Sequence, residues 1–169
     1  MNSNFRFLAY HGRGGIAKSS KKDFAGAITD FGKALEFDSS FVTTYVMRGI
    51  AKSDLKDYKG AIEDFNKAMQ INSQDPFVYY YLGLTKWNAK DFPGALTDLN
   101  KSITLNSQNG LAYWIRGLVK IKLGQKKSGC ADLGKAVGLG EKGASADTKK
   151  YVSNERPRSF MQKRVAGNK

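Results

Sequence analysis

The amino-acid sequence predicts an all-α fold, a solenoid of stacked antiparallel helix pairs. The chain of 169 residues repeats itself at a fixed period of 34 residues, and periods of this size are typical of stacked supersecondary units. Within each unit, apolar residues recur at three- and four-residue steps, which indicates two amphipathic helices. The connections between these helices are short polar turns, so neighbouring helices must run antiparallel.

Four columns of identical residues recur in every unit at this period. They are Gly15, Gly49, Gly83 and Gly117; Lys18, Lys52, Lys86 and Lys120; Asp30, Asp64, Asp98 and Asp132; and Lys33, Lys67, Lys101 and Lys135. A glycine inside a helix costs up to about 1 kcal/mol relative to alanine. A glycine at the same place in all four units therefore indicates close contact between the two helices of each unit.

The second unit illustrates the predicted elements. Its first helix surrounds Gly49, and a polar turn follows at residues 53–56. One face of its second helix carries Ala61, Ile62, Phe65, Ala68 and Met69. The next polar turn, residues 72–75, ends before Pro76, and proline suits the first position of a helix. The third unit is therefore expected to begin at Pro76.

These residues resemble the tetratricopeptide repeat. The matching positions are Gly49, Tyr58, Ala61, Phe65 and Ala68 in the second unit and Gly83, Phe92, Ala95, Leu99 and Ser102 in the third. The resemblance covers about residues 8–143 and implies a right-handed superhelix whose concave groove is lined mostly by the first helix of each unit. It also implies a scaffold that binds peptides or proteins. Two departures are serines at 39, 73 and 107, where a proline is usual, and the first lysine column, where apolar residues are more common.

The predicted organisation is one domain, residues 1–152, followed by a tail. The four repeats span about residues 8–41, 42–75, 76–109 and 110–143, and a capping helix covers 141–152. The first helix has three glycines within four residues, Gly12, Gly14 and Gly15. They predict an irregular or frayed start to this helix. Residues 153–169 show no period and are expected to form a basic, mobile tail.

The net charge of +13 favours acidic partners. Residues 141–169 carry 8 Lys and Arg against 3 Asp and Glu, which is the densest positive region. One interpretation is a solvated cationic surface without a specific partner. The alternative function is an adaptor for nucleic acid or another polyanion, with the lysine columns and the tail following a phosphate backbone.

The aspartate column has two interpretations. Arg48 and Arg116 precede the repeated glycines of the second and fourth units, and Leu82 stands there in the third. An aspartate on a second helix could form an ion pair with such an arginine, whose stem would pack on apolar surface. The other interpretation is a set of solvated charges, which contribute little to stability.

The predicted binding site is the aromatic face of the first helices in the third and fourth repeats. It comprises Phe77, Tyr80, Tyr81, Leu84, Trp87, Leu111, Trp114, Leu118 and Lys122. Trp and Tyr dominate interaction hot spots, so Tyr80, Trp87 and Trp114 are the expected anchors for a peptide or protein partner. Lys122 and Lys90 would add charges that favour acidic segments. The alternative is that these aromatic side chains form the core between repeats.

The inner-face positions Val46, Ile50, Tyr80 and Leu84 lack the charged or amide donors that a carboxylate clamp needs. The sequence therefore predicts no preference for a free peptide C-terminus.

Several function classes are disfavoured. His11 and Cys130 are the only histidine and cysteine, and Cys130 is expected to be a buried, inert thiol. Neither a metal site nor a nucleophile with its partners is therefore expected, and no phosphate-binding glycine loop follows a strand. The sequence predicts a protein without enzyme activity or cofactor. No apolar run reaches the roughly 18–20 residues of a membrane span. The chain is expected to be cytosolic, or a fragment whose targeting segment is left out, and its oligomeric state stays open.

Overall fold

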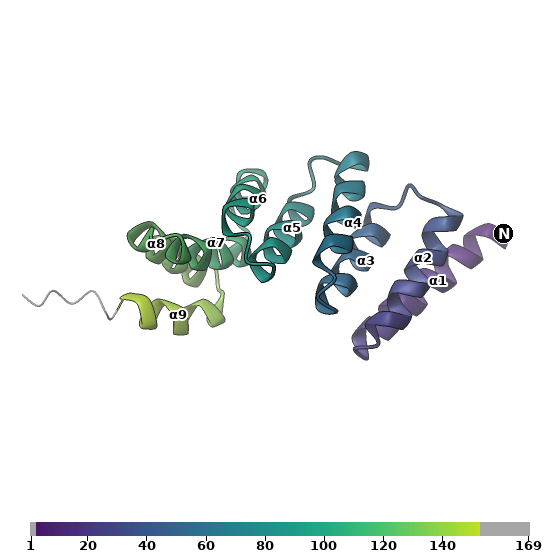
Figure 1. Cartoon of the computed structure of the whole chain (residues 1–169), viewed down its shortest axis with the longest axis horizontal. Coiled ribbons are helices and arrows are strands. Elements are labelled where there is room, and N and C mark those ends of the chain that lie inside the picture. The colour runs from purple at the N-terminus through teal and green to yellow at the C-terminus, as the bar shows by residue number, and fades with distance from the viewer. Residues whose placement is uncertain (1–2, 153–169) are drawn as a thin grey trace, which may run out of the picture. The chain divides into compact units, whose positions relative to one another are not determined.

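The computed structural model describes residues 3–152, with side chains for residues 12–151, and this part of the chain consists of helices and turns without a strand (Figure 1). The helices are α1 Ser3–Ser20, α2 Phe24–Phe37, α3 Val42–Asp54, α4 Tyr58–Ile71, α5 Pro76–Asn88, α6 Phe92–Leu105, α7 Gly110–Lys122, α8 Lys126–Gly138 and α9 Lys142–Val152. The predicted all-α fold is confirmed. The predicted tail, residues 153–169, lies outside the described residues.

The chain divides into two compact units, and each is described by itself. Unit 1 comprises residues 1–107 and contains three antiparallel pairs, α1 with α2, α3 with α4, and α5 with α6. Unit 2 comprises residues 108–169 and contains the pair α7 and α8, with α9 packed against α8. No helix in the described part of the chain is both long and apolar enough to cross a membrane.

The second helices of unit 1 all begin in the same way. An aspartate side chain precedes each helix and accepts a hydrogen bond of 3.0 Å from a backbone N–H three residues later. The three pairs are Asp23–Gly26, Asp57–Gly60 and Asp91–Gly94. Such capping satisfies one of the unpaired N–H groups at a helix start. In unit 2, by contrast, Gln125 precedes α8 and makes no side-chain capping bond.

The core of unit 1 lies between the paired helices. Phe31, Phe65 and Leu99 stand 34 residues apart and are at most 1% exposed. A Cβ atom added at Gly49 would lie 2.9 Å from the ring of Phe65, so only glycine allows α3 and α4 to pack this closely. The predicted packing role of the repeated glycines is thereby confirmed for this pair.

The prediction of an irregular first helix is wrong. α1 is continuous from Ser3 to Ser20, although glycines usually weaken helices. Contact with α2 explains the difference, because a Cβ atom at Gly15 would lie 2.6 Å from the ring of Phe31. A Cβ atom at Gly14 would lie 2.9 Å from the carboxylate of Asp30. Close packing between the two helices therefore stabilises a helix that local propensity disfavours.

One helix start in unit 1 lacks a cap that its counterparts have. Asp75 and Asn109 precede α5 and α7, and their side chains accept hydrogen bonds from the N–H groups of Phe77 and Ala112 at 2.9 and 3.1 Å. Phe41 precedes α3 and cannot accept such a bond. Replacing Phe41 with aspartate should therefore raise the free energy of unfolding by about 1 kcal/mol relative to Phe41→Ala. Urea unfolding of the two variants measures this difference, and equal stabilities would contradict it.

Candidate functional site

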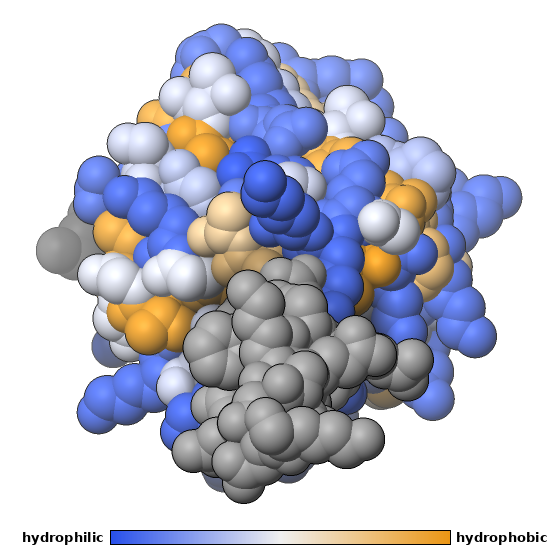
Figure 2. All heavy atoms as spheres, turned by 90° about the vertical axis from the view of Figure 1, so that its left-hand side faces the viewer, coloured by the Kyte–Doolittle hydropathy of each residue, from blue (hydrophilic) through white to orange (hydrophobic). Residues whose placement is uncertain are grey.

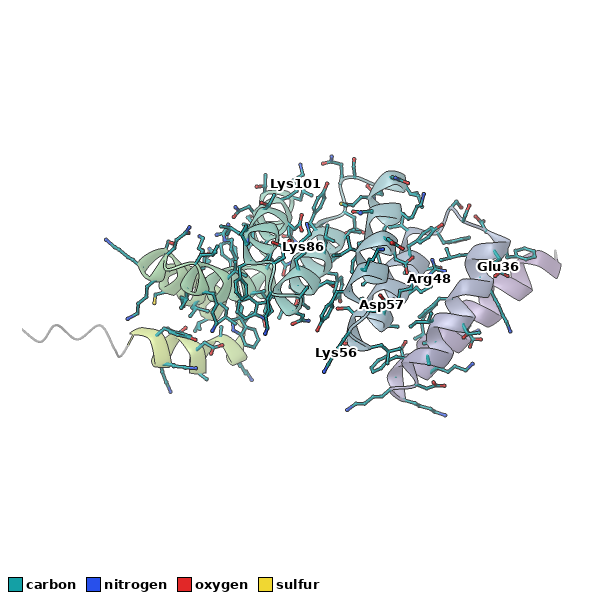
Figure 3. All side chains as sticks on the ribbon, in the orientation of Figure 1. Glu36, Arg48, Lys56, Asp57, Lys86 and Lys101 are labelled. Carbon is teal, nitrogen blue, oxygen red and sulfur yellow. The ribbon has the colours of Figure 1, made fainter. Side chains whose placement is uncertain are left out.

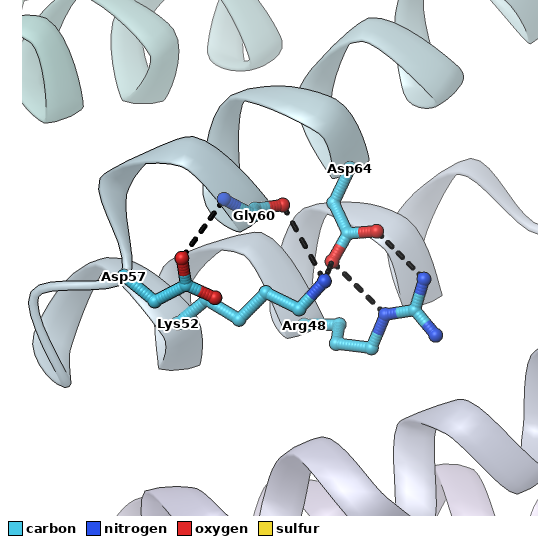
Figure 4. Close-up of polar contacts among 5 residues, drawn as sticks. All are labelled: Arg48, Lys52, Asp57, Gly60 and Asp64. Carbon is cyan, nitrogen blue, oxygen red and sulfur yellow. Dashed lines mark hydrogen bonds and ion pairs between the residues drawn. The ribbon is translucent and has the colours of Figure 1, made fainter.

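The aspartate column links the two helices of each repeat (Figure 4). Arg48 Nε and a terminal guanidinium nitrogen donate to the two carboxylate oxygens of Asp64, at 2.9 and 2.6 Å. Lys52 Nζ approaches the same carboxylate at 2.8 Å. Arg116 and Lys120 hold Asp132 in the same way, with contacts of 2.7 and 2.8 Å. The predicted ion pairs between helices are confirmed, and the solvated-charge interpretation is wrong for these two repeats.

The first lysine column is engaged in every repeat. The contacts, all 2.7–2.8 Å from Nζ to a carboxylate oxygen, are Lys18–Asp30, Lys52–Asp64, Lys86–Asp98 and Lys120–Asp132. In Figure 3, Lys86 lies among the helices of its repeat, whereas Lys56 points away from the turn between α3 and α4. Each lysine of this column therefore already has a counter-charge within its own repeat.

The third repeat differs because Leu82 occupies the position of Arg48. Asp98 has its ion pair with Lys86 at 2.7 Å, and no arginine of the described chain joins it. Burial raises the pKa of Asp98, and the contact with Lys86 lowers it to a smaller extent. In the second repeat, the hydrogen bonds to Asp64 raise the pKa of Arg48. The buried carboxylate of the third repeat is thus less well compensated.

The predicted site residues of unit 1 lie on α5 and differ in exposure. Phe77 is 55% exposed, and Tyr81 and Leu84 are half-buried. Tyr80 is 7% exposed and contacts Tyr81 edge to face, with ring centroids 5.0 Å apart. Trp87 is half-buried and packs against the ring of Phe92 on α6, with ring centroids 5.2 Å apart. Tyr80 is therefore almost fully buried, whereas Phe77 presents more than half of its surface to solvent.

Two further apolar residues share the register of Leu84. Ile16 on α1 and Ile50 on α3 precede it by 68 and 34 residues, and Ile16 is 49% exposed while Ile50 is half-buried. Neither residue belongs to the predicted binding site, although Ile50 is among the predicted inner-face positions. Their shared position in the repeat is the signal that identifies them. Together they form an aliphatic column on the three first helices of unit 1.

The predicted site residues of unit 2 lie on α7. Leu111 is 39% exposed, Leu118 is half-buried and Lys122 is exposed. Trp114 donates a hydrogen bond from Nε1 to the carboxylate of Asp147 on α9, at 2.8 Å. A Cβ atom at Gly143 would lie 2.3 Å from the indole ring. Trp114 therefore packs α9 against α7, in agreement with a structural role within unit 2.

The described residues hold no cluster that could bind a metal ion. Cys130 is half-buried, whereas the sequence predicts a buried thiol.

The matches to known proteins agree with this geometry. Residues 42–75 match the family model of the tetratricopeptide repeat. No curated protein matches the chain in sequence. Residues 42–75 are a tetratricopeptide repeat, and the chain has the fold of a tetratricopeptide repeat protein, as the sequence predicts.

Solved structures share this fold. PilF of Pseudomonas aeruginosa is 18% identical to this chain in sequence, and the two structures superpose with a TM-score of 0.82. The match covers 92% of this chain and 72% of PilF. The MamA protein is 24% identical with a TM-score of 0.72, covering 87% and 88%. The first tetratricopeptide domain of Spaghetti (RPAP3), bound to the HSP90 peptide SRMEEVD, is 21% identical with a TM-score of 0.65, covering 69% and 94%. Proteins of this fold commonly mediate protein–protein interaction and peptide binding.

Proposed function

We propose that the chain is a protein-interaction scaffold whose first helices bind a peptide or protein segment. The binding face of unit 1 comprises Ile16, Ile50, Phe77, Tyr81, Leu84 and Trp87. On α7 of unit 2, Leu111, Leu118 and Lys122 form the corresponding face. The observation that carries the proposal is the aliphatic column, because the same register position is apolar and accessible on each first helix of unit 1.

The chemistry of this face defines the ligand. Large apolar side chains exposed together are typical of interaction surfaces. Phe77 offers a rigid ring with most of its area accessible, and aromatic anchors of this kind contribute strongly to binding. The aliphatic column has no donor for a terminal carboxylate. The ligand is therefore a segment with apolar side chains, held along its length rather than by its C-terminus.

The alternative function, in which the lysine columns follow a nucleic-acid backbone, loses support from the ion pairs. A lysine that already contacts a carboxylate at 2.7–2.8 Å gains less from a phosphate, because the existing pair must first be broken. The first lysine column is therefore better explained as part of the scaffold.

The test is a selection of random peptides of about 12 residues on the full chain, followed by affinity measurements with the best binder. Phe77→Ala and Ile16→Ser should each raise the Kd about tenfold, which corresponds to about 1.4 kcal/mol. Ile71→Ser is the matched control, since Ile71 is 45% exposed but lies on the second helix α4. Its Kd should stay within about twofold of the wild type.

The same peptide made with a C-terminal carboxylate and with a C-terminal amide should bind equally. Unchanged affinity of Phe77→Ala and Ile16→Ser would show that the first-helix face is not the binding surface. A strong loss on amidation would contradict recognition along the length of the segment.

A further inference from the structure

Unit 2 carries most of the excess positive charge of the described chain. Residues 108–152 hold nine Lys and Arg against three Asp and Glu, whereas residues 1–107 hold 14 against 11. The net positive charge of residues 108–152 is therefore twice that of residues 1–107, although the segment is less than half as long. Figure 2 shows the side of the molecule on which α8 and α9 lie, where hydrophilic residues surround smaller hydrophobic patches.

The three acidic residues between positions 108 and 152 do not compensate this charge at the surface. Asp132 is buried and held by Arg116 and Lys120. Asp147 accepts the hydrogen bond from Trp114, and Glu141 is half-buried beside Gly110. Several exposed lysines form no ion pair among the described residues: Lys122, Lys127, Lys135, Lys142 and Lys149.

Two of these lysines lie on one exposed stripe of α8. Lys127, Ala131 and Lys135 follow each other at four-residue steps, and all three are exposed. Residues at this spacing share a helix face, and eight residues place the two lysines about 12 Å apart along the axis. A shallow hollow of about 490 Å³ adjoins the stripe, lined by Gly124, Gln125, Lys126, Lys127, Ser128 and Ala131. Ala131, which lies between the two lysines on the stripe, is itself exposed and carries only a small side chain.

We infer that this stripe of α8, Lys127, Ala131 and Lys135, is a second interaction surface that binds an acidic segment of a partner protein. Charge complementarity carries the inference, because uncompensated lysines attract carboxylates and accelerate their association. An extended chain rises about 3.3 Å per residue, so acidic residues four positions apart would match the two lysines.

Two other polyanions fit the stripe less well. Proteins that bind single-stranded nucleic acid combine positive charge with aromatic residues on which bases stack, and α8 contains no aromatic residue. Helices that bind membrane surfaces insert a face of large apolar side chains. On α8, Val137, at 40% exposure, is the exposed large apolar residue. The stripe thus offers charge without stacking or insertion.

The test uses the full chain and a fluorescent peptide of about 12 residues with alternating Asp and Ser. Its acids stand at every second position, so pairs four positions apart are included. A peptide with Asn in place of Asp is the uncharged control. Lys127→Glu with Lys135→Glu should raise the Kd at least tenfold. Binding to the wild type should weaken as NaCl rises from about 50 to about 200 mM.

The matched control is Lys33→Glu with Lys67→Glu. These two lysines are exposed, lie on α2 and α4 at the register of Lys135, and change the net charge equally. This variant should stay within about threefold of the wild type. An equal loss in both double variants would show non-specific attraction and overturn the inference.

Two competitors decide the class of partner. One is a single-stranded oligonucleotide, and the other is a phosphatidylcholine vesicle with about one third phosphatidylserine. One of these competitors could bind more tightly than the acidic peptide and lose that binding only with the α8 substitutions. That competitor, and not an acidic protein segment, would then be the occupant of the stripe. Phe77→Ala should leave the affinity for the acidic peptide unchanged, which separates this surface from the first-helix face.

Discussion

Replacing Phe65 with alanine should lower the free energy of unfolding by about 3–5 kcal/mol, the range for removing a fully buried aromatic side chain. Phe65 is 0% exposed, its ring abuts Gly49, and it stacks on Tyr81 with centroids 6.3 Å apart. The variant would leave a cavity between α3 and α4 that backbone shifts can fill only in part. Urea unfolding followed by circular dichroism measures the loss.

Phe77→Ala is the matched control for this prediction, because the same side chain is removed from a position that is 55% exposed. Its free energy of unfolding should stay within about 0.5 kcal/mol of the wild type. The two substitutions should therefore have different effects: Phe65→Ala lowers the free energy of unfolding, whereas Phe77→Ala weakens peptide binding. A similar loss of stability in both variants would mean that Phe77 also belongs to the core.

Asp64→Asn should lower the free energy of unfolding by about 2–3 kcal/mol. The change leaves Arg48 and Lys52 without their counter-charge, and breaking a buried ion pair costs about 3–5 kcal/mol. The lower figure follows because both cationic side chains keep some contact with water, at 22% and 18% exposure. Asp98→Asn is the comparison, since Asp98 has its ion pair with Lys86 and no arginine of the described chain. At neutral pH, Asp98→Asn should lower the free energy of unfolding much less than Asp64→Asn does, or should raise it.

The comparison between Asp98 and asparagine should depend on pH. Burial raises the pKa of Asp98 above its ordinary value, so the folded state binds the proton more tightly than the unfolded chain. The stability from this group is present below the unfolded pKa and is lost as the pH rises through the folded pKa. Asp98→Asn should therefore gain stability relative to the wild type as the pH rises from about pH 4, the ordinary pKa of an aspartate, through the raised pKa of Asp98. If Asp98→Asn instead loses stability relative to the wild type as the pH rises, the raised pKa of Asp98 is contradicted.

The repeat pattern predicted the helix pairs because it depends on short-range geometry. Apolar residues at helical steps identify a buried face, and a glycine that recurs at one register indicates close helix packing. Gly49 against Phe65 confirms both points. The pairing of Arg48 with Asp64 could also be proposed, since the two columns recur at a fixed separation on paired helices. For the candidate site, the sequence identified the aromatic residues of the first helices. It placed Ile50 on the inner face but did not include Ile16 or Ile50 in the site, because each alone is an ordinary helix residue.

The tertiary structure decided what covers each face. A periodic pattern shows that Trp114 lies on an apolar side of its helix, but only the contact with Asp147 and Gly143 shows that α9 packs there. Local propensity predicted an irregular α1, and packing against Phe31 outweighs it. The raised pKa of Asp98 likewise follows from its burial, which outweighs its contact with Lys86. Helix formation depends on nearby residues, whereas burial, exposure and ionisation depend on neighbours that are distant in the sequence.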